Sequence, residues 1–216
     1  MNRVEKAAPI LALLRKYEAP PSAAKAQGVP SSYEVVYSGI SAKHRTKALL
    51  TSYPVKEIIE WQGFVVANGA ASSAAGAYQI IRKTLVSLNL PGARVFDAAC
   101  QDECALRLMD LRGWAKCEAG SMTPEAFGDQ LAREWASMPV HTAQKGQKRW
   151  VRRGESYYAG DGLNAAHAGP DEVMTAVRAA LAVPTQPPAT PDLTAWLAEG
   201  RRLHTALGEW LAQAPT

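Results

Sequence analysis

The feature that most constrains this chain is a run of small residues that ends in a tyrosine and a glutamine, Ala71-Ser-Ser-Ala-Ala-Gly-Ala-Tyr-Gln-Ile80. Small side chains and a glycine let the backbone turn tightly and lie close to a bulky ligand. Tyr78 and Gln79 then supply an aromatic face and an amide, which are groups that bind sugars. Gly-x-Tyr-Gln is short enough to occur by chance, so this turn gains meaning only together with other features of the chain.

An isolated acid far upstream of this turn, Glu18, is the second such feature. Leu11, Leu14 and Glu18 fall at i, i+3 and i+7 of a helix that Pro20-Pro21 must end, so the acid extends an apolar stripe. It also lies in the last turn, where the helix dipole disfavours a carboxylate. Both effects raise the pKa of a carboxyl group, as a general acid requires. A surface glutamate at a frayed helix end is the alternative.

Composition fits one globular domain. The chain has 216 residues, of which 47% are apolar, enough for a core. No apolar run approaches the roughly 20 residues of a membrane span, and the N-terminus lacks the apolar region of a secretory signal. The formal net charge of +4 suits a polyanionic surface such as a bacterial wall, but it equally suits a nucleic acid.

The chain has three cysteines, Cys100, Cys104 and Cys117, and an odd number implies no disulfide framework. Cys100 and Cys104 share one face of a predicted helix, but histidine, which would complete a metal site, is scarce around them. We therefore expect buried free thiols.

Caps and apolar periodicity predict a mostly helical chain. Helices are expected from Pro9 to Glu18, over Val55–Gln62, over Ile80–Leu88, over Phe96–Leu111, from Thr123-Pro124 to about Ser137, and over Pro170–Leu181. Tyr33–Gly39 alternates and is rich in β-forming residues, which predicts a strand, and a second short strand is expected near Lys47–Thr51. The basic segment His141–Gly154 is expected to be a loop.

The C-terminal part of the chain changes composition sharply. Residues 183–191 are proline-rich and predict a semi-rigid extended linker. Beyond the linker, apolar residues recur every three or four positions and predict a helix with a narrow apolar seam. That seam comprises Leu193, Trp196, Leu197, Gly200, Leu203, Leu207 and Trp210. The helix either docks on a partner protein or folds back on the core, and both possibilities stay open.

The order of the motifs carries a resemblance to a known family. It runs through Tyr17-Glu18, Tyr33–Gly39, Ser72-Ser-Ala-Ala-Gly-Ala-Tyr-Gln79, Gln101-Asp102, Leu111-Arg-Gly113, Glu134-Trp-Ala-Ser-Met-Pro139 and Tyr158-Ala-Gly-Asp-Gly-Leu163. In this order the chain resembles the bacteriophage lambda endolysin family, the phage-type lytic transglycosylases within the lysozyme-like superfamily. The resemblance covers roughly residues 8–182, and the Gly-Ala-Tyr-Gln and Trp-Ala-Ser-Met-Pro blocks are its most specific parts.

The resemblance implies an α+β fold: a mostly helical lysozyme-like domain with a small β-hairpin lobe (residues 1–182), followed by the linker (183–191) and a C-terminal amphipathic helix (192–216). The family's catalytic acid ends the first helix and maps to Glu18. The small polar residue that usually follows it is Ala19 here, and residues 141–154 look longer than the family needs. The implied substrate-binding residues are Ser72, Ser73, Tyr78, Gln79 and Tyr158. No metal or cofactor is implied.

Cleaving the β-1,4 bond between N-acetylmuramic acid and N-acetylglucosamine requires an acid for the leaving oxygen. No second acid belongs to a motif, although Glu34 and Glu57 lie near in sequence. In transglycosylases of this type the muramyl 6-hydroxyl attacks the anomeric carbon and leaves a 1,6-anhydro end, so Glu18 alone would suffice.

Three other classes stay open. The first is a hydrolytic muramidase (lysozyme), in which Glu34 or another acid activates water. The second is a virion-associated structural protein that binds the wall without cleaving it. The third is a nucleic-acid binder that uses the basic segment. The residues it would use are Lys145, Lys148, Arg149, Trp150, Arg152 and Arg153, with no nucleic-acid fold motif around them.

The expected partner is bacterial peptidoglycan, and the C-terminal helix would dock on phage or phage-like particle proteins. No nucleic-acid partner and no transmembrane segment are expected. The protein would either stay in the host cytoplasm until its release to the periplasm and cell wall, or be virion-associated.

Overall fold

The structure, a computed structural model, describes residues 2–162, 164–182, 201, 202 and 204. The predicted linker lies outside the described residues. So does the predicted C-terminal helix, apart from three isolated positions.

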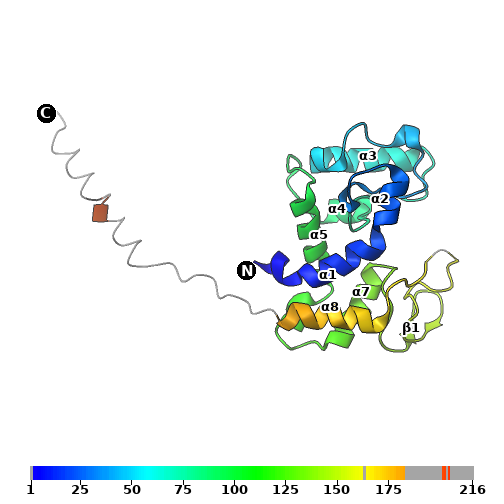
Figure 1. Cartoon of the computed structure of the whole chain (residues 1–216), viewed down its shortest axis with the longest axis vertical. Coiled ribbons are helices and arrows are strands. Elements are labelled where there is room, and N and C mark those ends of the chain that lie inside the picture. The colour runs from blue at the N-terminus through cyan, green and yellow to red at the C-terminus, as the bar shows by residue number, and fades with distance from the viewer. Residues whose placement is uncertain (1, 163, 183–200, 203, 205–216) are drawn as a thin grey trace.

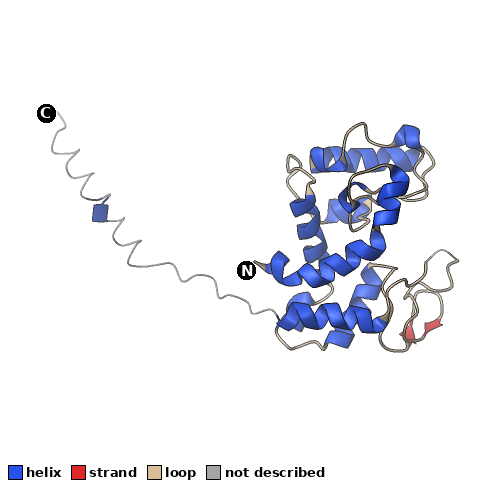
Figure 2. Cartoon of the chain, in the orientation of Figure 1, coloured by secondary structure: helices blue, strands red, loops and turns tan. Residues whose placement is uncertain are grey.

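Helices dominate the described chain, and Figure 1 shows their arrangement. The α-helices are α1 (Arg3–Glu18), α2 (Pro21–Gln27), α3 (Val55–Ala67), α4 (Arg82–Ser87), α5 (Ala98–Leu111), α6 (Trp114–Glu118), α7 (Pro124–Glu134) and α8 (Pro170–Ala182). Three 3₁₀ turns are η1 (Ser32–Glu34), η2 (Ala42–His44) and η3 (Leu50–Ser52). The strands β1 (Gln144–Lys145) and β2 (Trp150–Val151) form a two-stranded antiparallel sheet, drawn in red in Figure 2. The predicted mostly helical α+β class with a small hairpin is confirmed.

Helix α1 lies at the centre of the core. It packs against α8 on one side and α5 on another, and α7 packs against α8. Its apolar stripe, which includes Ile10, Leu11 and Leu14, is almost completely buried. Burying such a stripe supplies most of the stability of a helix in a protein. The position of the last residue of α1 is therefore fixed by the whole core.

The first turn of α1 lies further upstream than predicted. Asn2 and Glu5 form a reciprocal capping box, so the helix begins at Arg3 and Pro9 lies inside it. The expectation that Pro9 marks the first turn was wrong, because the capping box satisfies the N-terminal amides seven residues earlier. Pro20 caps α2 and Pro21 is its first residue, so this pair separates two helices as expected.

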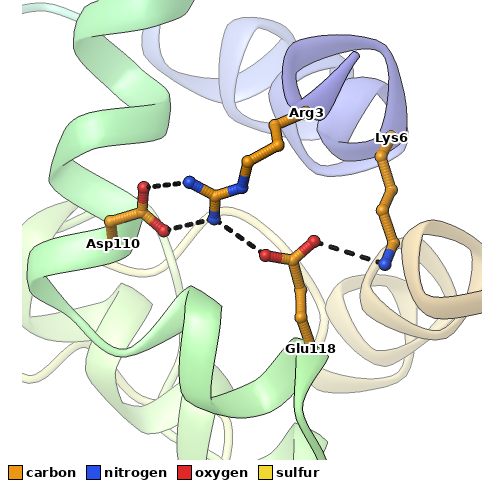
Figure 3. A network of polar contacts seen from close by, with 4 residues as sticks. All are labelled: Arg3, Lys6, Asp110 and Glu118. Atoms are coloured by element: carbon orange, nitrogen blue, oxygen red, sulfur yellow. Dashed lines mark hydrogen bonds and ion pairs between the residues drawn. The ribbon is translucent and has the colours of Figure 1, made fainter. Parts of the chain in front are cut away.

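Ion pairs hold the first turn of α1 against α5 and α6 (Figure 3). Arg3 donates two hydrogen bonds to Asp110, at 2.8 and 2.7 Å, and one to Glu118 at 2.8 Å. Lys6 reaches the other oxygen of Glu118 at 3.3 Å. These side chains link α1 with α5 and α6, with Lys6 itself buried.

The two predicted strands in the region before α3 are wrong. Tyr33 and Glu34 belong to the 3₁₀ turn η1, and the second segment, Lys47–Thr51, overlaps the 3₁₀ turn η3. Within 33–39, Val36 forms only an isolated bridge, with Ala75. The amide of Gln27 takes the place of a neighbouring strand, because it accepts from Val36 N at 3.0 Å and donates to Val36 O at 2.7 Å.

Several other expectations are confirmed. Thr123 caps α7, and its hydroxyl accepts from Ala126 N. Gly113 follows the end of α5 with a φ of 99°. Two other expectations need correction. Helix α7 ends at Glu134, three residues before the predicted end. The segment 141–154 is not a loop throughout, because it contains the hairpin β1–β2.

The three cysteines are buried and free, as predicted. Within the described part of the chain, no helix is both long and apolar enough to cross a membrane.

Candidate active site

Glu18 is the last residue of α1, and its carboxyl group contacts a serine from a distant part of the chain. Ser137 Oγ donates a hydrogen bond of 2.5 Å to Glu18 Oε1. Burial raises the pKa of Glu18 above its ordinary value, and the hydrogen bonds from Ser137 oppose this rise because they favour the charged form. Glu18 is therefore an acid that holds its proton to higher pH than a surface glutamate.

Ser137 is itself fixed by main-chain contacts. It lies in the turn between α7 and the hairpin, in the Trp-Ala-Ser-Met-Pro block. Its carbonyl accepts from His167 N at 2.8 Å and from Ala168 N at 3.1 Å. Sequence reasoning noted this block but assigned Ser137 no role. A hydroxyl in a motif of otherwise apolar residues was the only available signal.

A second set of contacts joins the last turn of α1 to α8. Lys16 Nζ donates to Glu172 at 2.6 Å, and Tyr17 Oη donates to the other oxygen of Glu172 at 2.5 Å. The two residues directly before Glu18 are thereby anchored. This restrains the helix end that carries the acid.

The small-residue turn has the tight geometry that its sequence predicts. Gly76 has a φ of 79°, and a Cβ atom at this position would lie 2.2 Å from Gln101 Oε1. The same oxygen accepts from Ala77 N at 2.9 Å. Only glycine fits there, because the side chain of Gln101 occupies the space and the backbone is left-handed.

Gln79 holds this turn together. Its φ is 47°, and its amide nitrogen donates to Val35 O at 3.2 Å and to Gly76 O at 2.9 Å. Next to it, Trp135 Nε1 donates to Tyr78 O at 3.2 Å. The turn is thus joined directly to the block that supplies Ser137, which brings together the two motifs that the sequence singled out.

Tyr78 is 1% exposed, and this burial contradicts the prediction that its ring offers a face for stacking on a sugar. Its hydroxyl donates to Asp102 at 2.5 Å and accepts from Arg15 at 2.7 Å. Tyr33 donates to the same Asp102 oxygen at 2.9 Å. Burial is the main cause that raises the pKa of both tyrosines, that of Tyr33 to about 12. The cluster of Arg15, Tyr33, Tyr78 and Asp102 thus connects α1 and α5 with the small-residue turn.

The other predicted binding residues also make contacts within the protein. Ser73 is buried, and its hydroxyl accepts from Arg82 N at 2.9 Å, at the start of α4. Ser72 is partly exposed and accepts from Ala74 N at 3.2 Å. Tyr158 donates to Arg133 O at 2.6 Å from the loop after the hairpin. The predicted residues thus fall into two groups, the turn 72–79 and the region of Tyr158.

A hollow of about 530 Å³ borders the end of α1. Arg15, Lys16 and Ala19 line one side of it, and α2 with the residues that follow it lines the other. Among the described residues, no group of three or more His, Cys, Asp or Glu side chains is arranged to hold a metal ion. Glu18 is not one of the residues that line this hollow, but its neighbour Ala19 is. Next to the hollow, the end of α1 offers one carboxyl group with a raised pKa that accepts from a serine hydroxyl.

The fold is a mostly helical α+β domain, and a carboxyl group with a raised pKa, that of Glu18, ends its first helix. Comparison with protein families matches the endolysin family over residues 12–162, and the chain belongs to this family. It is thus a phage enzyme that degrades bacterial peptidoglycan. The matched region contains Glu18, the small-residue turn, Ser137 and Tyr158. Neither the curated proteins nor the solved structures yielded a match.

Proposed function

We propose that this endolysin is a lysozyme-like lytic transglycosylase that cleaves the β-1,4 bond between N-acetylmuramic acid and N-acetylglucosamine, with Glu18 as its one catalytic acid and base. The observation that carries the proposal is the carboxyl group of Glu18, which burial keeps protonated to higher pH and which Ser137 contacts at 2.5 Å. A carboxyl group with a raised pKa keeps its proton to higher pH than a surface glutamate does, which a general acid requires.

In the proposed reaction Glu18 protonates the glycosidic oxygen, and the bond between that oxygen and the muramyl anomeric carbon breaks. The muramyl 6-hydroxyl then forms a new bond to this carbon and gives its proton to the carboxylate. Glu18 is thereby restored, and the product carries a 1,6-anhydro end. Ser137 stabilises the intermediate carboxylate by donating its hydrogen bond.

The surroundings of the other acids support a mechanism with one carboxyl group. The buried Glu34 accepts from Thr51 Oγ1 at 2.5 Å and from Thr51 N at 3.4 Å. Asp102 is engaged by Tyr33, Tyr78 and Arg15. Among the described residues, no hydrogen bond or ion pair joins Glu34 or Asp102 to Glu18.

We further propose that residues 1–182 form the catalytic domain and that the turn 72–79 supports substrate binding. The burial of Tyr78 favours a supporting role for its ring. The more exposed Ser72 and Gln79 and the main chain of the turn are then the groups that meet the glycan, together with Tyr158.

The test compares wild-type protein with Glu18→Gln and Glu34→Gln on purified wall, with the products analysed by mass spectrometry. We expect 1,6-anhydromuramyl ends from wild type and from Glu34→Gln, and no products from folded Glu18→Gln. Products heavier by one water, with reducible ends, would instead identify a hydrolytic muramidase. Activity in Glu18→Gln would refute the assignment of the acid.

A further inference from the structure

The hollow of about 530 Å³ next to the end of α1 has walls whose charged residues are all cations. They are Arg15 and Lys16 on α1 and Lys25 on α2, the helix that directly follows α1 (Figure 1). Among the described residues, no aspartate or glutamate lines the hollow. The proposed reaction proceeds through Glu18 and Ser137 and makes no use of these cations.

Lys25 carries a charge that no acid compensates within the described part of the chain. It lies exposed in the last turn of α2. Its ammonium group forms no hydrogen bond and no ion pair with any described residue. An anion that binds Lys25 therefore displaces water and breaks no contact between described residues.

The other two cations are paired, but they keep unused donors that reach solvent. Arg15 donates only through Nη1, to Tyr78 Oη at 2.7 Å and to Asp102 at 3.4 Å, and its side chain is 27% exposed. Lys16 pairs with Glu172 at 2.6 Å, yet its side chain is 59% exposed. A guanidinium group has five N–H donors and an ammonium group has three, so both residues retain donors for an anion.

The rest of the lining combines free hydroxyl groups with small apolar side chains. Ser31 and Ser32 are partly exposed, and their hydroxyls form no hydrogen bond with a described residue. Ala19 and Ala24 are 0% and 6% exposed and form a small apolar cluster against which Val29 packs. The hollow therefore offers polar donors at its exposed edge and methyl groups at its buried side.

A ligand that matches this lining is anionic, accepts several hydrogen bonds and carries small apolar groups. A carboxylate accepts from lysine, arginine and serine together, and bonds that involve such a charge are the stronger ones. The methyl group of an alanine suits the apolar side of the hollow. The short peptides attached to muramic acid in peptidoglycan contain alanine and carry free carboxylates. A phosphate polymer supplies the charge but lacks the methyl groups.

We propose that this hollow binds the peptide of peptidoglycan, with a peptide carboxylate on Lys25 and an alanine methyl group against Ala19 and Ala24. The inference rests on the proposed function, because the peptide is attached to the muramic acid whose bond Glu18 cleaves. Ala19 directly follows Glu18 and lines the hollow, so the peptide site begins one residue from the acid. The enzyme then recognises both the glycan and the peptide of its substrate.

The experiment measures binding of the free wall tetrapeptide (alanine, glutamate, diaminopimelate, alanine) to the full-length protein by calorimetry or NMR titration. The same peptide with its carboxylates amidated, and inorganic phosphate, are the comparison ligands. We expect the acidic peptide to bind most tightly. Lys25→Glu should weaken its binding about tenfold, because a repulsion replaces an attraction. Lys116→Glu is the matched control, because Lys116 is also exposed in the last turn of a short helix and forms no ion pair with a described residue.

Equal affinity for the acidic and the amidated peptide would overturn the peptide site. So would inorganic phosphate that binds as tightly as the acidic peptide, or a Lys25→Glu protein that binds this peptide as tightly as Lys116→Glu does. Melting temperatures show whether both variants are folded, and Lys25→Met provides a milder change if Lys25→Glu unfolds. Failure of the proposed function looks different, because the peptide has no glycosidic bond: folded Glu18→Gln would then still cleave wall, whatever the peptide does.

Discussion

At the scale of single residues, the site depends on how burial changes the free energy of one charge. Glu18 has a raised pKa in the folded protein. At a pH between the unfolded and the folded pKa, the folded state therefore holds a proton that the unfolded state has lost. Stability that is present below the unfolded pKa, about 4.3 for a glutamate, is therefore lost as pH rises through the folded pKa. Above the unfolded pKa, Glu18 therefore makes the fold less stable than a neutral side chain of the same shape would.

Glu18→Gln should therefore melt at a higher temperature than wild type at pH 7 while losing activity. A neutral amide avoids the desolvation of a charge, so the difference in melting temperature should shrink toward pH 4. Circular dichroism melts across this range provide the measurement. Glu57→Gln, at an exposed position of α3, is the control and should show no such trend. A melting difference that does not change with pH would contradict the desolvation argument.

Ser137→Ala removes the hydroxyl that favours the charged form of Glu18. Its loss should raise the pKa of Glu18 further. The alkaline limb of the pH–activity profile should then move to higher pH, and the maximum rate should fall because the intermediate carboxylate loses a hydrogen bond. Initial rates of wall clearing from pH 4 to pH 9 test this. A limb that moves to lower pH would contradict it, and Ser137→Thr, which keeps a hydroxyl, should restore the wild-type profile.

At the scale of elements, the hairpin β1–β2 displays a basic surface. The hairpin follows the turn that carries Ser137, the residue that bonds to Glu18. Val151 is completely buried and anchors the hairpin, whereas Trp150 is 64% exposed. Some cationic side chains of this region are paired with nearby acids, so they are less available to bind an anionic polymer. Arg149 pairs with Glu155 at 2.8 Å and Arg153 pairs with Asp171 at 2.6 Å. Lys145, Lys148 and Arg152 form no ion pair within the described residues.

The unpaired cations should attract the anionic wall, so activity should fall as salt rises past about 0.15 M, where the screening length is about 8 Å. Changing Lys145, Lys148 and Arg152 together to glutamine should flatten this dependence. The matched change of Arg149 and Arg153 should flatten it less, because local acids already neutralise these two arginines. Equal effects of the two sets would contradict this distinction. Tight binding of the wild type to random duplex DNA would instead support the nucleic-acid alternative.

The elements that sequence could predict are those whose signals are local. The Thr123-Pro124 cap and the apolar periodicities of α3, α5 and α8 lie within each helix, so they were recognisable. The predicted strand at 33–39 failed because its partner is the side chain of Gln27, which no local pattern reveals. The prediction that α1 begins at Pro9 failed because Asn2 and Glu5 form a capping box, which starts the helix earlier and leaves Pro9 inside it.

At the scale of the whole molecule, the site combines segments that are far apart in sequence. Glu18 and the turn stand out in the sequence because an acid on an apolar stripe and a run of small residues are unusual by themselves. The contact of Ser137 with Glu18 joins residues 119 positions apart, and the hydroxyl of the buried Tyr78 bonds to Arg15 and Asp102 from two different helices. Such contacts follow from packing, and composition alone does not reveal them.

The described core closes without the C-terminal segment. Helix α8 buries Val173, Met174, Val177 and Ala180 and packs against α1 and α7. Among the described residues, the contacts that position Glu18 and Ser137 come from α8 or from residues before it. Truncation after Val183 should therefore leave a folded enzyme with normal activity on purified wall fragments, measured by its melting temperature and by release of muropeptides.

The residues beyond Val183 should instead bind a partner, because the apolar seam predicted from Leu193 to Trp210 is too apolar to remain in water alone. Truncation should abolish self-association in sedimentation experiments or attachment to purified phage particles. The second outcome would identify a virion component, and the first a free endolysin that associates with itself. Unfolding of the truncated protein would show that the segment belongs to the core. A truncated protein that is folded, active and unchanged in every association would show that the segment has neither role.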